Sequence, residues 1–227
     1  MSSYNRSLTT ITEADVHICI LLIFYILIVG NLMDYNSLRL SAYSLLTLII
    51  FFSYGFYIND YFDMPYDISA GKKRFVHSIP KIHSIAIMAV MTLVAFIIVI
   101  FFINDTNYFI LYAVAYLLAT FYSAPPLRFK EKVFSGPVVD MLIEKTVPMA
   151  LIVVLFHYFK LDGLLLIFIF SFFQLYIILL HQLVDFEADS SSGVSTFVTK
   201  IGKKTSEKII NYMDCTPKSG QVVKKHS

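Results

Sequence analysis

The sequence contains no tryptophan and only two cysteines among its 227 residues. Cys19 lies inside an apolar run and Cys215 near the C-terminus, so neither a disulfide framework nor a cysteine metal site is predicted. Charged residues are also scarce, at 15% of the chain against about 25% in soluble domains. The net charge of +2 gives no indication of nucleic-acid binding. The composition therefore excludes an ordinary soluble domain.

Apolar residues are abundant. They make up 57% of the chain, and the mean hydropathy is +0.70. They form long runs at residues 16–33, 40–58, 82–103, 108–127, 136–159 and 164–184. At about 1.5 Å per residue, such helices span roughly 25–33 Å, which matches a hydrocarbon core of about 30 Å. We therefore expect an all-α polytopic transmembrane helix bundle with about six spans. The first run has neither a basic leader nor a small-residue cleavage site, so it is predicted to be a span and not a signal peptide.

Basic residues are distributed unequally between the connections. The connections after the first, third and fifth runs are short and carry only Arg39 and Lys160. The other connections hold Lys72, Lys73, Arg74, Lys81, Arg128, Lys130 and Lys132, and seven more lysines follow residue 190. The positive-inside rule therefore predicts a cytoplasmic N-terminus, cytoplasmic polar loops and a cytoplasmic C-terminal tail.

An acidic stretch, Asn59 to Asp67, directly follows the second apolar run. On a helix, Asp60, Asp63 and Asp67 would share one face and would repel one another unless a cation held them. Hard carboxylate oxygens suit Mg²⁺, which usually completes its shell with water and substrate phosphate. Pro65 lies within the stretch and predicts that the helix ends near Asp63, leaving Asp67 on a loop.

A second acidic pair, Asp185 and Asp189, ends the sixth run with helical i, i+4 spacing. The predicted topology places it on the same side of the membrane as the first stretch. The two groups could hold a diphosphate through bridging Mg²⁺ ions, with basic loop residues neutralising the remaining charge. The alternative is that the acids simply cap helix ends, although acids at a helix C-terminus oppose the macrodipole.

These motifs resemble those of the UbiA-type intramembrane prenyltransferases. The pattern from Asn59 to Asp67 looks like the first aspartate signature of that family, and Asp185-x-x-x-Asp189 resembles the second. The segment Tyr122-Ser-Ala-Pro-Pro-Leu-Arg128 resembles the loop after the fourth helix of the family. The three motifs occur in the expected order, and the resemblance covers roughly residues 16–205.

The resemblance implies transfer of an isoprenyl group from an isoprenyl diphosphate to a hydrophobic acceptor, aromatic or lipid, inside the membrane. It implies Mg²⁺ as the cofactor, with ligands Asp60, Asp63, Asp67, Asp185 and Asp189. Asn59 and Tyr122 are the expected catalytic residues. The expected diphosphate-binding residues are Lys73, Arg74, Arg128 and Lys130, although positive-inside topology alone also explains these charges.

Tyrosines near the proposed site have two interpretations. The faces of Tyr54, Tyr57, Tyr61 and Tyr122 could stabilise an allylic cation, or the rings could belong to an interfacial aromatic belt. Asp140 and Glu144 lie in the first turns of the predicted fifth helix, where negative charge is favourable. A catalytic role for these two carboxylates is the other possibility.

The sequence also departs from the family. Phe75 follows Arg74 where members usually have proline, and six spans are predicted where the family usually has about nine. We expect a prenyltransferase-like domain over residues 1–205 and a basic, disordered tail over residues 206–227. The alternative to an enzyme is a catalytically incomplete paralogue or subunit that binds the diphosphate and needs a partner or a second copy. An ion-coupled transporter is disfavoured because its acidic residues would lie near mid-membrane.

Overall fold

The computed structural model of the protein describes residues 8–213 except 70, 72 and 194. This part of the chain is helical throughout, with no β-strand in the described residues, which confirms the all-α prediction. The long helices are α1 (Leu8–Val29), α2 (Tyr35–Ser69), α3 (Lys81–Ile98), α4 (Thr106–Ser123) and α7 (Leu161–Val184). The shorter helices are α5 (Ser135–Met141), α6 (Val147–Leu155), α8 (Phe186–Ser192), α9 (Phe197–Ile201) and α10 (Lys203–Met213).

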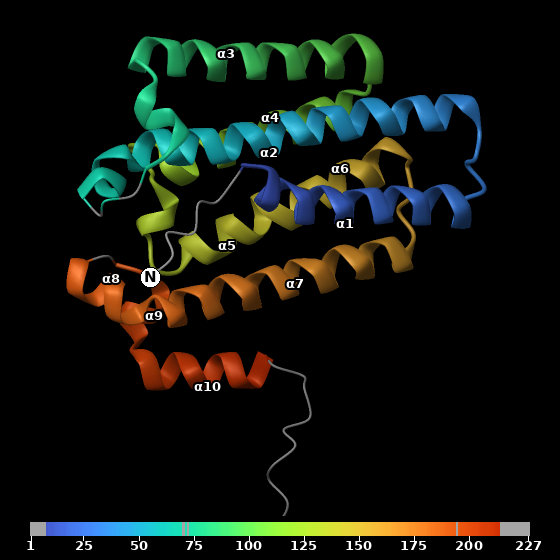
Figure 1. Cartoon of the computed structure of the whole chain (residues 1–227). Helices are drawn as coiled ribbons and strands as arrows, with labels where there is room; N and C mark the ends of the chain where they lie inside the picture. Colours follow the sequence, from blue (N-terminus) through green and yellow to red (C-terminus); the bar gives the residue numbers. More distant parts are fainter. Residues whose placement is uncertain (1–7, 70, 72, 194, 214–227) are drawn as a thin grey trace, which may run out of the picture.

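Helices α1 to α4 alternate in direction, and α7 runs in the same direction as α4 because the α5–α6 segment returns between them (Figure 1). Helices α2, α4 and α7 all end at one end of the bundle, where the α2–α3 and α4–α5 connections and α8 lie. At the other end the turns are tight, with left-handed backbone at Asn31 and Asn104, a conformation that asparagine tolerates. All the polar connections predicted to form a site therefore lie together.

Among the described residues, three helical segments are long and apolar enough to cross a membrane: Tyr35–Ser69, Lys81–Ile103 and Leu161–Val184. The second of these consists of α3 and the π-helical segment η2 (Val99–Ile103) that continues it. Large apolar side chains such as Leu93, Phe101 and Phe168 are exposed on α3, η2 and α7. Exposed apolar surface of this extent fits helices that face lipid.

Two helix boundaries differ from the predicted ones. Helix α2 continues through Pro65 to Ser69, so the expected break near Asp63 is wrong. Pro65 costs only one backbone hydrogen bond near the end of a helix that packs against α1, α3 and α4. Helix α4 ends at Ser123, earlier than predicted, because the Pro125-Pro126 pair that follows cannot continue it.

The predicted fifth span is interrupted by a π-helical segment, η4 (Leu142–Thr146), between α5 and α6. The expected disordered tail is wrong for residues 206–213, because α10 covers them. Charged lysines of α10 face outward while Ser206 and Ile210 are buried, an amphipathic pattern that a search for continuous apolar runs does not detect. Residues 214–227 lie outside the described part of the chain.

A column of tyrosines on α4 joins this helix to α2. The Tyr112 hydroxyl donates to the carbonyl of Thr47 at 2.7 Å, and the Tyr108 hydroxyl lies 3.0 Å from the Thr47 hydroxyl. Near the polar end, Tyr54 and Thr120 share a hydrogen bond of 2.7 Å. Hydrogen bonds between apolar helices fix their register, so this interface sets the height of the last turn of α4 beside the acidic stretch of α2.

Candidate active site

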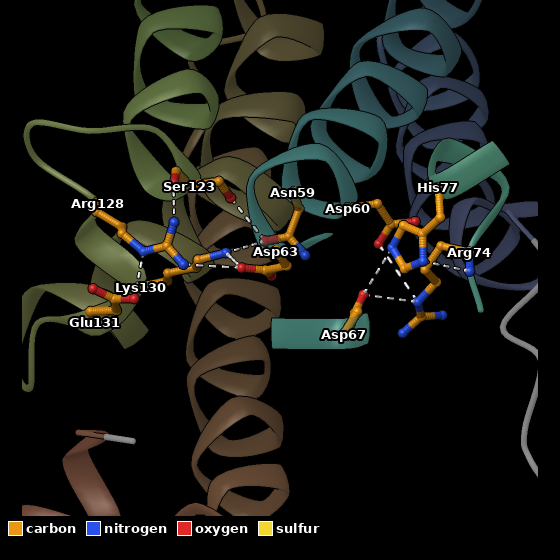
Figure 2. A network of polar contacts seen from close by, with 10 residues as sticks. All are labelled: Asn59, Asp60, Asp63, Asp67, Arg74, His77, Ser123, Arg128, Lys130 and Glu131. Atoms are coloured by element: carbon orange, nitrogen blue, oxygen red, sulfur yellow. Dashed lines mark hydrogen bonds and ion pairs between the residues drawn. The ribbon is translucent and has the colours of Figure 1, made fainter. Parts of the chain in front are cut away.

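The first polar cluster joins α2 to the connection between α4 and α5. Asn59 and Asp63 are one helical turn apart on α2, and they meet Arg128 and Lys130 from that connection (Figure 2). Nζ of Lys130 donates to Oδ1 of Asn59 at 3.0 Å and also contacts Asp63. Nη2 of Arg128 lies 3.2 Å from Oδ1 of Asp63. The structure thus brings together four residues that the sequence analysis selected separately.

The shape of the connection explains how Arg128 reaches α2. Oγ of Ser123, the last residue of α4, donates to Oδ1 of Asn59 at 2.8 Å. The chain then turns sharply, with Arg128 in the left-handed region at φ 39°. Arg128 is held by a 2.5 Å contact with Glu131 and lies over the ring of Tyr66, 5.2 Å from its centroid. Several contacts thus hold this guanidinium beside Asp63.

A second polar cluster lies on the other side of α2. Nε of Arg74 lies 3.4 Å from Oδ2 of Asp67 and 3.9 Å from Oδ1 of Asp60 (Figure 2). Nε2 of His77 is 3.9 Å from the same oxygen of Asp67. The three aspartates therefore do not form one acidic face, because Asp63 turns toward Lys130 while Asp60 and Asp67 turn toward Arg74. The sequence analysis missed His77, which is visible in the sequence only as a polar residue close to Arg74.

The pKa of Lys130 depends on its burial and on its contact with Asp63. Removal from water lowers the pKa of the Lys130 ammonium, and its contact with Asp63 opposes this shift. Its side chain is only 14% exposed. A partly desolvated cation held between two oxygens exerts a stronger field on an arriving anion than a solvated one.

The remaining predicted residues are less closely gathered. Lys73 is exposed, and no ion pair joins it to another described residue. Asp185 is exposed at the junction of α7 and α8, and Asp189 is partly buried on α8. This junction lies at the same end of the bundle as the two clusters (Figure 1). Within the described residues, no three Asp, Glu, His or Cys side chains come close enough to hold a metal ion, so the two signatures do not form one preassembled coordination group.

Tyr122 belongs to a third polar cluster, between α4, α5, η4 and α7. Its side chain lies near the carboxyl groups of Asp140 and Glu144. Nε2 of Gln174, on α7, donates to Oδ2 of Asp140 at 3.2 Å and also to Oε2 of Glu144. Gln174 was not predicted, although a lone amide inside an apolar run is a signal for a buried polar contact.

An apolar groove of about 760 Å³ runs between α2, α3 and α4. Its walls include Tyr54 and Tyr61 from α2, Met88 and Phe96 from α3, and Thr120 from α4. Tyr61 and Phe62, which line the groove, lie between Asp60 and Asp63 in the chain, so this end of the groove lies at the level of both clusters. The groove is open along its side, where exposed Ile85 and Leu93 contribute to the lining.

The carboxylates fit Mg²⁺ by the chemistry of their oxygen atoms. Asp60 and Asp67 both approach one cationic atom, Nε of Arg74, so the pair is arranged around positive charge. Asp60 and Asp67 could hold a divalent ion on this side of α2, whereas Asp63 lies on the other side beside Lys130. Asp185 and Asp189 are the other candidate ligands.

Comparison with known proteins identifies the family of the chain. A family model described as the UbiA prenyltransferase family matches residues 18–214. No curated protein and no solved structure matches the chain. The matched segment contains both aspartate signatures and all the polar clusters described above. The chain belongs to the UbiA prenyltransferase family.

Proposed function

We propose that the protein transfers an isoprenyl group from an isoprenyl diphosphate to a hydrophobic acceptor in the membrane, with Mg²⁺ as cofactor and diphosphate as leaving group. The observation that carries the proposal is the meeting of Lys130, Arg128 and Asn59 around Asp63. Partly buried cations beside carboxylates, at the polar end of an apolar groove, match the two halves of such a substrate.

Different residues bind the diphosphate and the isoprenyl chain of the substrate. Lys130 and Arg128 bind the diphosphate, and Asn59 orients Lys130 through their 3.0 Å hydrogen bond. The residues that would hold Mg²⁺ are Asp60, Asp63, Asp67, Asp185 and Asp189, and the ion would supply positive charge that neutralises the leaving diphosphate. The isoprenyl chain lies in the apolar groove, where the rings of Tyr54 and Tyr61 face the developing allylic cation. The groove keeps water from the cation until the acceptor reacts.

The basic connections favour an orientation with this end in the cytoplasm. A water-soluble diphosphate headgroup would then approach from the cytoplasm, while the isoprenyl chain enters from the membrane. Both parts of the substrate would thus meet where the groove reaches the polar clusters.

Membranes that contain the full chain test the proposal. They are incubated with tritiated geranylgeranyl diphosphate and Mg²⁺, and released diphosphate and label in the lipid fraction are both measured. We expect release and transfer, with release lowered about 100-fold or more in Asp63→Asn and Asp185→Asn variants. Undiminished release in both variants would refute the assigned roles. Binding without release, or activity only with a co-expressed partner, would instead indicate an incomplete paralogue or subunit.

A further inference from the structure

The Asp140–Glu144–Gln174 cluster places two carboxylates between largely apolar helices. Asp140 is 5% exposed and Gln174 is 8% exposed. Ionisable groups inside transmembrane bundles are costly, and they usually mark a substrate path or a proton relay. The diphosphate-binding roles described above do not use these residues.

One amide nitrogen connects the two carboxylates. Because Nε2 of Gln174 donates both to Asp140 and to Glu144, the acidic groups lie within a few ångströms of each other. Two carboxylates this close, one buried and the other only partly exposed, favour a state in which they share a proton. A pair in that state can accept or return a proton without creating a new isolated charge.

The backbone holds Glu144 in place. Glu144 lies in the π-helical segment η4, and π-helical turns inside α-helices are frequent at functional sites. The next residue, Lys145, forms a buried ion pair with Asp15 of α1. This pair fixes η4 against a neighbouring helix, so the position of Glu144 does not depend on its contact with Gln174 alone.

The last turn of α4 lies between this cluster and the diphosphate-binding cluster. Tyr122 lies near Asp140 and Glu144, while the adjacent Ser123 donates to Asn59 at 2.8 Å. An acceptor beside Tyr122 would therefore have the leaving diphosphate on one side and the carboxylate pair on the other. Electron-pair donation and proton removal would take place on opposite sides of the same molecule.

We propose that Glu144 is the general base that removes the acceptor's proton, with Asp140 and Gln174 as positioning residues. This inference rests on the proposed function. The bond between the allylic carbon and the diphosphate oxygen breaks, and its electron pair leaves with the diphosphate. The acceptor forms the new bond to the allylic carbon, and the proton that it loses goes to the Glu144 carboxylate. Glu144 is assigned this role because it is partly exposed, whereas Asp140 is buried behind it.

The test compares two rates in membranes carrying the full chain, again with tritiated geranylgeranyl diphosphate and Mg²⁺. In Glu144→Gln, transfer of label to the acceptor should fall about 100-fold or more, as general-base contributions usually do. Diphosphate release should stay close to the unsubstituted rate, with the missing label recovered as the prenyl alcohol. Glu144→Asp keeps a carboxylate and should recover part of the transfer.

Asp162→Asn is the matched control. Asp162 lies at the other end of the bundle, at the start of α7, where Tyr25 and Tyr158 donate to Oδ2 at 2.6 and 2.7 Å. Its loss should leave the ratio of transfer to release unchanged. Unchanged transfer in Glu144→Gln, or a parallel fall in transfer and release, would overturn the base assignment, as would release without transfer in the unsubstituted chain. No release by the unsubstituted chain would instead overturn the proposed function itself.

Discussion

Replacement of Lys130 by methionine tests the diphosphate-binding cluster with little effect on the fold. Lys130→Met removes the ammonium but keeps a flexible apolar side chain of similar length. Asp63 retains a cation, because Nη2 of Arg128 remains 3.2 Å from Oδ1 of Asp63. Asn59 also retains the hydrogen bond from Ser123. The variant should therefore fold, and its main loss should be in binding of the substrate headgroup.

The expected size of this loss follows from the contacts of Nζ. A hydrogen bond from a charged group to a charged acceptor contributes about 1.5–3 kcal/mol. Since about 1.4 kcal/mol corresponds to a tenfold change in affinity, the Kd for an isoprenyl diphosphate should rise about 10- to 150-fold. Burial favours the upper part of this range, because the Lys130 side chain is 14% exposed and poorly screened by solvent.

Equilibrium binding of tritiated geranylgeranyl diphosphate to the purified protein in lipid nanodiscs measures this change. Lys132→Met is the matched control, since it removes the same charge from the same connection. Lys132 is exposed, and its Nζ lies 5.2 Å from the centroid of the Phe129 ring. Its loss should change the Kd little, because salt screens exposed charges. Equal effects of the two substitutions, or an unchanged Kd in Lys130→Met, would refute specific headgroup binding by Lys130.

Two further predictions concern the metal and the fold. Chelation with EDTA should abolish diphosphate release, and Mg²⁺ should restore it better than Ca²⁺, which is larger and prefers more ligands; release that continues in EDTA would contradict a Mg²⁺ requirement. Lys145→Met leaves Asp15 buried without its cation and should lower the free energy of unfolding by about 3–5 kcal/mol, measured by thermal unfolding in detergent. Adding Asp15→Leu should recover most of that loss, and no recovery would show that Lys145 acts through other contacts.

The predicted helices were easier to place than their ends. Long uncharged runs identified every major helix, because the requirement to satisfy backbone hydrogen bonds in lipid allows few alternatives. The helix ends were harder to predict, because the effect of a helix-breaking residue competes with packing against neighbouring helices. Pro65 was expected to end α2, yet packing against three neighbouring helices carries the helix on to Ser69. Helix α10 was missed because its apolar face is narrow and interrupted by lysines.

In the candidate site too, residues could be predicted from the sequence, but their contacts could not. Asn59, Asp63, Arg128 and Lys130 could be selected from motif order and residue type alone, but not their partners. Helical spacing suggested that three aspartates share a face, whereas the two neighbouring connections divide them between Lys130 and Arg74. The metal-binding and catalytic roles remain predictions, since contacts among the side chains do not test them.

The sequence alone determined the family, the helical class and the collection of polar connections at one end of the bundle. These properties depend on composition, order and spacing, which do not require knowledge of distant contacts. Only the tertiary structure decided which cation meets which carboxylate, and that Gln174 joins Asp140 to Glu144. The pairings made by Lys130 and Gln174 join residues 30 or more positions apart, and they depend on the height and rotation of packed helices.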